Sequence, residues 1–456
     1  MPLTPGHFTS RTLRQAPWGP AVARILAAAI AAVEPGAAVE AAIQRRGSRL
    51  AIAGREYDLD QVRRVFLVAV GKASAPMAQA AAQILGSRLS GGVVITKDAY
   101  SESPLPSLLR LLQAGHPLPD ERSVQAAQQV TALLEEAQPG DLLLALISGG
   151  GSALLAAPAS GIHLQDLQAL TAALLACGAD IHAINTLRKH LDQLKGGGLA
   201  RQAAPAQVAA LILSDVVGDS LEVIASGLTA PDPSTFSDAL QILRRYGLLE
   251  LTPPAILARL RAGERGELPE TPKPGDPLFA QVHNAIIASN RQAAQAALGQ
   301  AQAEGFQGLL LTTCLQGEAR QAGRALAALL QQASAGRAPL SRPLCLLAGG
   351  ETTVTLRGSG LGGRNQELAL GAVSELAGLP NLALLTLATD GGDGPTDAAG
   401  AAVTGETLAR AQQLGLDPTA YLARNDAYHF FAALDDLLKP GPTHTNVNDL
   451  TFLFAF

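Results

Sequence analysis

The amino-acid sequence predicts two α/β domains, and three observations support this fold class. The chain has 456 residues, more than the roughly 250–300 residues at which one hydrophobic core usually stops growing. Short runs rich in Val, Ile and Leu alternate with longer stretches of helical character, as in sheets built from crossover units. Several of these runs end in Gly, Ser or Asp, and open α/β sheets bind their ligands at such strand ends.

Seven apolar runs are the expected strands. They occupy residues 65–70, 92–96, 141–148, 208–216, 308–313, 343–350 and 383–390. Their alternation with helices predicts mainly parallel sheets. A stretch rich in Pro and charged residues, 251–279, interrupts the alternation and is typical of a connector. We therefore expect an N-terminal domain over 1–250 with a Rossmann-like, doubly wound parallel sheet, and a smaller α/β domain over 280–456.

Composition restricts the class of partner. Hydrophobic residues make up 48% of the chain and charged residues 16%, which fits an ordered globular protein. The 34 basic and 39 acidic residues give a net charge of -5, so no basic field attracts a nucleic-acid backbone. The apolar run between Arg24 and Glu34 is about ten residues long, too short to cross a bilayer. We expect a cytoplasmic monomer or homodimer that binds small molecules, with no nucleic-acid or membrane partner.

Lys72 is the first candidate for anion binding. It follows the first strong strand in the sequence Gly71-Lys72-Ala73-Ser74, which leads into a helix. An ammonium group at a strand-to-helix turn can meet a phosphate; the alternative is an ordinary solvated lysine. The segment is not a P-loop, because Phe66 stands where that motif requires its first glycine.

A glycine-rich turn follows the expected strand at 141–147. It contains, in order, Ser148, Gly149, Gly150, Gly151 and Ser152. Bare backbone N–H groups at the start of a helix can converge on an anion, so the turn is a candidate phosphate or carboxylate site. The alternative is a flexible turn. It is not a dinucleotide fingerprint, because Leu154 occupies the third glycine position.

Charged residues elsewhere add further candidates. Arg188 and Lys189 lie on the polar face of an expected amphipathic helix over 184–195, a face that is usually solvated unless it lines a cleft. Asp215, Asp390 and Asp393 lie at the ends of expected strands. Carboxylates there can hold Mg²⁺ or take a hydroxyl proton, and the alternatives are helix caps and Asx turns.

Arg364 follows a glycine pattern. Gly358, Gly360 and Gly363 match G-x-G-x-x-G, but the preceding strand is poor and no acidic partner follows, so we do not expect dinucleotide binding here. The guanidinium of Arg364 is the more informative group, because it is suited to clamp carboxylate or phosphoryl oxygens.

Taken together, these segments resemble the class II glycerate kinases. The resemblance covers residues 71–74, 115–121, 148–155, 184–191, 195–197, 214–219, 224–227, 349–355, 362–367, 389–401 and 445–450. It implies a glycerate-kinase N-terminal domain, a C-terminal MOFRL domain and an active site in the interdomain cleft. Lys72 and Arg364 would correspond to the essential lysine and arginine of the family, with Asp215 close by.

The resemblance implies ATP-dependent phosphorylation of D-glycerate, with 2-phosphoglycerate and ADP as products and ATP and Mg²⁺ as cofactors. Asp215 would align or deprotonate the hydroxyl, and Asp390 and Asp393 would bind the metal. Arg188 or Lys189 would bind the substrate carboxylate. Asn290 and Glu351 complete the candidate binding residues.

Two alternatives remain open at this point. Some members of the family carry the name hydroxypyruvate reductase, which keeps an NAD(P)H-dependent reductase in view, although a dinucleotide fingerprint is lacking. A non-catalytic small-anion-binding protein on the same fold is the other. The chain also departs from the family pattern at Leu228, Gly392 and His444, which concerns local loop geometry.

Overall fold

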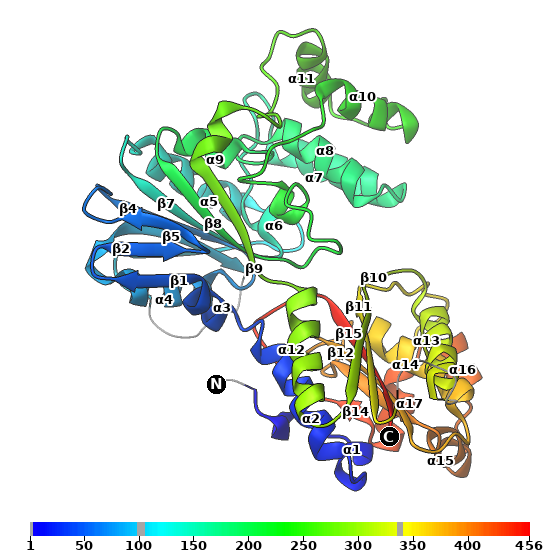
Figure 1. The fold of residues 1–456 in the computed structure, drawn as a ribbon. Coiled ribbons are helices and arrows are strands. Elements are labelled where there is room, and N and C mark those ends of the chain that lie inside the picture. Colours follow the sequence, from blue (N-terminus) through cyan, green and yellow to red (C-terminus); the bar gives the residue numbers. More distant parts are fainter. Residues whose placement is uncertain (1–2, 98–104, 335–340) are drawn as a thin grey trace. The chain divides into compact units, whose positions relative to one another are not determined.

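The computed structural model describes residues 3–97, 105–334 and 341–456. The chain forms two compact units. Residues 35–287 form one, which we call the parallel-sheet unit, and residues 1–34 together with 288–456 form the other, the mixed-sheet unit. Figure 1 shows the elements of each.

The parallel-sheet unit has the predicted Rossmann-like architecture. Its strands are β4 (Val65–Val70), β5 (Leu89–Lys97), β6 (Leu109–Ala114), β7 (Leu142–Ile147), β8 (Gln207–Leu213) and β9 (Val282–Ala288). They are arranged as β6-β5-β4-β7-β8-β9, and the pairs from β6 to β8 are parallel. Counted along the chain, this is the order 3-2-1-4-5-6 of dinucleotide-binding folds, which reverses between the first and fourth strands. The prediction of a doubly wound parallel sheet is confirmed.

Nine α-helices belong to the described part of this unit. They are α3 (Pro35–Ala42), α4 (Ser74–Leu85), α5 (Glu121–Glu135), α6 (Gly151–Leu154), α7 (Leu164–Ala176), α8 (Ile181–Leu191), α9 (Gly198–Ala203), α10 (Phe236–Arg245) and α11 (Pro254–Glu264). A small antiparallel sheet of β1 (Ile43–Arg46), β2 (Arg49–Ile52) and β3 (Arg55–Asp58) precedes β4. Side chains of α7, α8, α10 and α11 form their own buried apolar cluster, which fixes α8, the helix that carries Arg188 and Lys189.

The mixed-sheet unit differs from the expected parallel sheet. Its strands are β10 (Gln307–Leu315), β11 (Leu344–Gly350), β12 (Leu382–Ala388), β13 (Gly400–Thr404), β14 (Leu437–Leu438) and β15 (Asp449–Ala455), in the order β10-β11-β15-β12-β13-β14. Only β10 and β11 pair in parallel among the described strands of this sheet. The expectation is wrong here because β15, from the end of the chain, lies between β11 and β12 and runs antiparallel to both.

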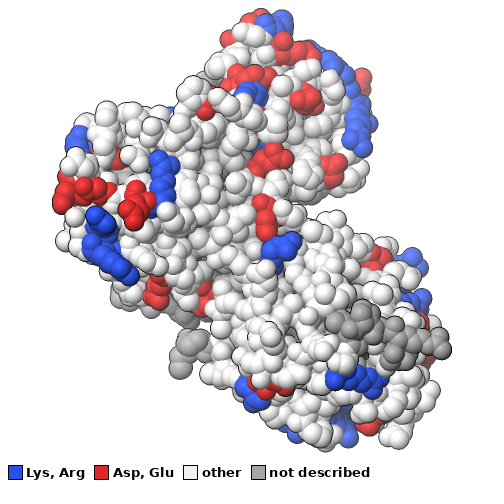
Figure 2. Space-filling model, viewed as in Figure 1, with Lys and Arg blue, Asp and Glu red and all other residues white. Residues whose placement is uncertain are grey.

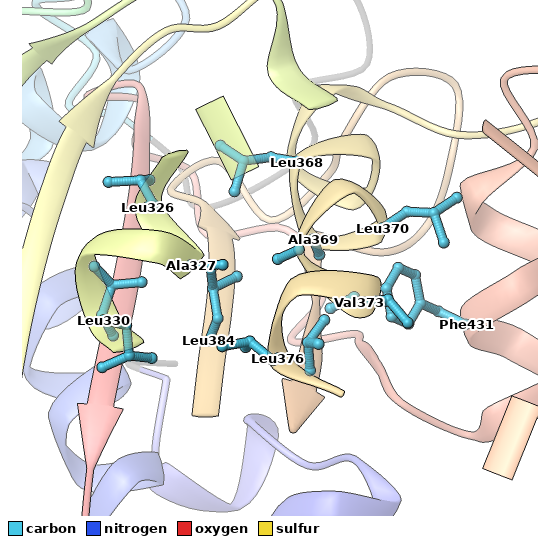
Figure 3. Close-up of a cluster of buried hydrophobic side chains, with 14 of the residues drawn as sticks. Leu326, Ala327, Leu330, Leu368, Ala369, Leu370, Val373, Leu376, Leu384 and Phe431 are labelled. Carbon is cyan, nitrogen blue, oxygen red and sulfur yellow. The ribbon is translucent and has the colours of Figure 1, made fainter. Parts of the chain in front are cut away.

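Two helices cover this sheet through a dense apolar core. They are α13 (Ala319–Ser334) and α14 (Arg364–Leu376). Figure 3 shows Leu326, Ala327 and Leu330 of α13 facing Leu368, Ala369, Val373 and Leu376 of α14, with Leu384 of β12 and Phe431 of α17 (Ala427–Leu434) beside them. A Cβ atom at Gly371 would lie 2.9 Å from Cα of Arg320, so a glycine is needed where the helices approach. This core positions the first turn of α14, which begins at Arg364.

The compact units differ from the domains expected at 1–250 and 280–456. Helix α2 (Gly19–Ala31) packs along α12 (Asn290–Ala303), and Arg24 pairs with Glu304 at 2.6 Å, so residues 1–34 belong to the mixed-sheet unit. Stacking of Trp18 on Phe456, with ring centroids 4.2 Å apart, also ties the N-terminal segment there. The expected connector at 251–279 lies within the parallel-sheet unit, because α11 contributes Ile256 and Leu260 to a buried cluster.

Helix length and surface charge add two observations. Over residues 3–97, 105–334 and 341–456, the only segment with the length and composition of a membrane span is the pair α2 and α3, which is bent by 61°. On the face in Figure 2, Lys and Arg side chains are interspersed with Asp and Glu, and neither sign dominates that face.

Candidate functional site

Two predicted turns meet where the strand order of the parallel sheet reverses. The chain leaves β4 at Gly71 and the neighbouring β7 at Ser148. The N–H of Lys72 donates to the carbonyl of Gly149 at 2.9 Å, and the N–H of Ala73 donates to Ser148 Oγ at 3.1 Å. A Cβ atom at Gly71 would collide with Ser148. Lys72 and the glycine-rich turn therefore form one structure at the position where open α/β sheets bind ligands.

Gly150 lies between two side chains with different charge. Its φ is +84°, a conformation that favours glycine. A Cβ atom there would lie 3.0 Å from the His116 ring and 3.3 Å from Cγ of Lys72. Partial burial of the ring, together with the positive charges of Lys72 and Lys97, lowers the pKa of His116 to about 4. A neutral imidazole and an ammonium group thus flank the turn at pH 7.

His116 was not among the residues predicted to act. It follows β6, in the segment 115–121 that contributed to the family resemblance. The segment 115–121 was the signal in the sequence that could have pointed to His116. However, a single His beside Pro117 belongs to no motif whose residue spacing indicates a catalytic or binding role. The fold places it beside Gly150 because β6 ends at the same edge of the sheet as β4 and β7.

Asp215 also approaches the turn. It follows β8, which pairs with β7, and its side chain is partly buried. A Cβ atom at Gly149 would overlap the Asp215 carboxyl group, so the absence of a side chain at Gly149 makes room for this carboxylate. The structure thus brings together Lys72, Asp215 and the glycine-rich turn, as predicted.

Ser152, at the end of the turn, lines a pocket between α7 and α8. Leu170, Leu187 and other apolar side chains form most of its wall, and Arg188, Asp192 and Lys195 contribute charge. Asp192 accepts four hydrogen bonds, from the N–H groups of Ala157, Leu194 and Lys195 and from Lys195 Nζ. Within the residues that the structure describes, this carboxylate is occupied and does not hold the Arg188 guanidinium.

The structure separates Arg188 from Lys189. Lys189 is buried and pairs with the fully buried Asp232 at 2.6 Å, which makes it a structural ion pair. Arg188 faces the pocket, where burial lowers its pKa and the charge of Asp192 opposes that effect. Arg188 is therefore the cation of this helix that is placed to meet an anionic ligand.

Arg364 is held by two carboxylates in the mixed-sheet unit. Its Nε and Nη2 donate to the two oxygens of Asp449 at 2.5 and 3.2 Å, and Nη1 donates to Glu351 at 2.6 Å. Burial opposes the charge of Arg364, but these carboxylates raise its pKa above the ordinary value. Burial raises the pKa of Asp449, although Arg364 opposes that shift. Asp449 therefore orients the Arg364 guanidinium, and the partly exposed Glu351 is its second carboxylate partner.

Asn290 supports the same region. It is the first residue of α12 and is buried, and its side-chain N–H group donates to the carbonyls of Val447 and Asp449, both at 2.9 Å. Its Oδ1 is buried without a hydrogen-bond partner among the described residues. Asn290 therefore orders the entry to β15, the strand that carries Asp449, and its predicted ligand role is untested by this contact.

Asp390 and Asp393 have the geometry of the alternatives to metal binding. Asp393 is buried, and its two oxygens accept the backbone N–H groups of Asn365 and Gln366 at 3.1 and 2.8 Å, which caps α14. Asp390 is exposed and accepts the N–H of Gly392 at 3.2 Å, an Asx turn. Within the described parts of the chain, no group of three or more His, Cys, Asp or Glu side chains fits a metal ion. Mg²⁺ bound with a nucleotide needs only one or two protein carboxylates, so the metal role predicted for Asp390 and Asp393 stays a prediction.

The G-x-G-x-x-G segment has a packing role. A Cβ atom at Gly358 or Gly360 would lie 2.6 Å from the carbonyl oxygen of Arg424. The side chains of Asn425 and Asp426 accept the N–H groups of Gly358 and Leu361 at 3.1 Å each. These glycines permit the close approach of two backbone segments.

The buried cap of α14 predicts an unusual pH dependence. Burial raises the pKa of Asp393 to about 7, outweighing the N–H groups of Gln366 and Asn365, which lower it. Because the folded protein then holds a proton that an unfolded Asp releases near pH 4, the contribution of Asp393 to stability should fall as the pH rises from about 4 to about 7.

The chain has a single Trp, Trp18, in the mixed-sheet unit, and its fluorescence reports unfolding of that unit. As the pH rises over this range, the denaturant midpoint of the wild type should decrease relative to that of Asp393→Asn, because Asn does not titrate. An increase would mean that the N–H groups, rather than burial, set the pKa of Asp393.

Two family models match this chain. One, described as a domain of unknown function (DUF4147), matches residues 21–261. The other, the MOFRL family, matches residues 344–449. Both matched regions contain candidate residues described above: Lys72, Arg188 and Asp215 in the first, and Glu351, Arg364 and Asp393 in the second.

Known proteins are similar over most of the chain. D-glycerate 2-kinase from Thermotoga maritima is 44% identical over 387 residues, which cover 85% of this chain and 89% of that protein. A protein from Agrobacterium vitis named putative hydroxypyruvate reductase is 42% identical over 389 residues, 85% of this chain and 86% of that protein. The crystal structure of a glycerate kinase from Thermotoga maritima aligns with a TM-score of 0.84 at 41% identity, covering 95% of this chain and 98% of that one.

Proposed function

Because the chain belongs to the class II glycerate kinase family, we propose that it transfers a phosphoryl group from ATP to D-glycerate, giving 2-phosphoglycerate and ADP. One observation carries the proposal from the structure. Lys72, Asp215 and the glycine-rich turn converge where the order of the parallel sheet reverses, and such positions bind ligands in open α/β folds.

The phosphates of ATP lie over the turn in this proposal. No side chain stands at Gly150, whose Cβ position lies beside Lys72 and His116, so an anion can approach the backbone there. Lys72, half-buried beside Gly150, neutralises charge on the transferring phosphoryl group. Positioning and electrostatic stabilisation do most of the work in phosphoryl transfer, which suits a site built from fixed backbone and cationic side chains.

The acceptor is held by two groups of the same unit. Asp215 aligns the glycerate hydroxyl and accepts its proton, because its carboxylate lies against the turn at Gly149. Arg188 binds the glycerate carboxylate with its planar pair of donors. Of the two cations proposed for that role, Lys189 is engaged by Asp232, so Arg188 is retained.

Arg364 acts on the same phosphoryl group in this proposal. Asp449 holds the guanidinium in one orientation by two hydrogen bonds, and a preoriented cation stabilises developing charge without further rearrangement. Of the two carboxylates proposed for Mg²⁺, Asp393 is engaged as the cap of α14, so the exposed Asp390 is retained as the candidate ligand. Magnesium would enter with the phosphates of ATP.

One experiment distinguishes the kinase from its alternatives. Purified protein is incubated with D-glycerate and ATP·Mg²⁺ while ADP release is coupled to an indicator, and the product is identified by its phosphorus NMR spectrum. In parallel, NADH oxidation is followed with hydroxypyruvate. ADP release that depends on glycerate supports the kinase, NADH oxidation alone supports the reductase suggested by one relative's name, and inertness in both assays supports an anion-binding protein.

A further inference from the structure

The hydroxyl group of Ser226 is buried between the glycine-rich turn and α8. Its Oγ lies 2.8 Å from Ser152 Oγ and donates to Asn185 Oδ1 at 3.0 Å. Since a hydroxyl has one proton to donate, Ser152 is the donor in the first contact. Ser226 is 0% exposed, so water does not compete for these hydrogen bonds.

The backbone around Ser226 is held in a costly conformation. Ala225, Ser226 and Gly227 have φ values of +48°, +57° and +67°, and left-handed geometry is unfavourable for the two residues that carry a Cβ atom. The carbonyls of Ser226 and Gly227 accept the N–H groups of Gly196 and Gly197 at 3.0 and 2.7 Å. These contacts hold the segment in place, and the result is that the Ser226 hydroxyl points between Ser152 and Asn185.

The hydrogen-bonded chain runs from the glycine-rich turn to α8, the helix that carries Arg188. Ser152 ends the turn that we assign to the phosphates and also lines the pocket beside Arg188. Asn185 is fixed by a second hydrogen bond, to the carbonyl of Val223 at 3.4 Å, and lies one helical turn before Arg188 on α8. A displacement of the turn is therefore transmitted to the helix that carries the cation for the acid.

We propose that Ser226 is a positioning residue that couples the two substrate subsites, so that nucleotide at the turn and glycerate at Arg188 favour each other's binding. The inference rests on the proposed function and adds a property to it. Coupling of this kind is reciprocal and typically changes affinity by about fivefold or more. No ligand touches the Ser226 hydroxyl itself, since Ser226 is fully buried.

Ser226→Gly is the direct test. Glycine adopts a φ of +57° readily, so the variant removes the hydroxyl and keeps the backbone. D-glycerate is titrated by calorimetry with and without a non-hydrolysable ATP analogue and Mg²⁺. In the wild type the analogue should tighten glycerate binding at least about fivefold. In Ser226→Gly both ligands should still bind, and the ratio of the glycerate dissociation constants without and with the analogue should be close to one.

Two further variants make the test specific. Asn381→Gly makes the same kind of change at an exposed residue of the mixed-sheet unit with a φ of +59°, and should keep the wild-type ratio. Ser152→Ala breaks the same chain without altering the strained segment, and should also lose the coupling. It keeps the inference testable if Ser226→Gly does not fold.

The possible results separate the inference from the proposed function. The coupling would be overturned if both ligands bind and the analogue does not change the glycerate dissociation constant of the wild type. It would also be overturned if the analogue changes that constant by the wild-type factor in both Ser226→Gly and Ser152→Ala. Either result would leave the kinase proposal standing. A wild-type protein that binds neither glycerate nor nucleotide would overturn both. A lower melting temperature in Ser226→Gly with an unchanged ratio would show that Ser226 only stabilises the fold.

Discussion

Lys72→Ala should lower kcat/KM for ATP and D-glycerate at least a hundredfold while the protein remains folded. A hundredfold loss corresponds to about 2.7 kcal/mol of transition-state stabilisation. The fold should persist because the backbone N–H of residue 72 still donates to Gly149 and the side chain is only partly buried. Initial rates of ADP release, with circular dichroism of the same samples, check the result.

Lys97→Ala is the matched control for Lys72. It removes the same charge at the end of β5, the neighbouring strand, and both lysines act on His116. We expect its kcat/KM to stay within about threefold of the wild type, because a charge displaced from the reacting group is screened by solvent. Equal losses of kcat/KM in both variants would mean that the overall positive potential of the region, rather than Lys72 itself, supports the reaction. Near-normal turnover of Lys72→Ala would remove Lys72 from the mechanism.

Arg364→Met should destabilise the mixed-sheet unit by about 3 kcal/mol, because it leaves the buried carboxylate of Asp449 without its partner. The side chain of Asp449 is 9% exposed and that of Arg364 is 32% exposed. Methionine keeps much of the apolar stem and removes the charge. Denaturant unfolding followed by the fluorescence of Trp18, which lies in the same unit, measures the loss.

The double variant Arg364→Met/Asp449→Asn separates structure from catalysis. Asparagine removes the uncompensated charge, so stability should return most of the way to the wild-type value. If Arg364 acts on the phosphoryl group, the double variant should remain at least about a hundredfold below wild type in kcat. Recovery of activity along with stability would show that Arg364 serves only to neutralise Asp449.

The parallel sheet and its turns were predictable because their signals are local. Residues 65–70 and 142–147 are apolar at every position, and the strands found there, β4 and β7, are buried at every position. Glycines and a lysine directly after such strands must lie at strand ends, so Lys72 and the turn were correctly predicted to share one edge of the sheet.

The mixed sheet was not predictable in the same way. Strand β15 pairs with β11 and β12, which begin more than sixty residues before it, and sequence alternation does not specify such distant partners. Likewise, α2 belongs with α12 because their small and apolar faces pack together. An amphipathic pattern shows that a helix has a buried face, but not which element covers it.

The sequence alone determined which chemistry is available: cations, carboxylates and bare glycine backbone at strand ends. Tertiary structure decided which of these groups is free to act. Arg188 and Lys189 are adjacent in sequence but point to different surroundings, so one lines a pocket and the other is paired with Asp232. Asp393 became a helix cap because α14 begins beside it, and Ser226 acquired its place between two subsites because a left-handed backbone turns it inward. Such choices depend on contacts between segments distant in the chain, whose geometry a local pattern of residues does not encode.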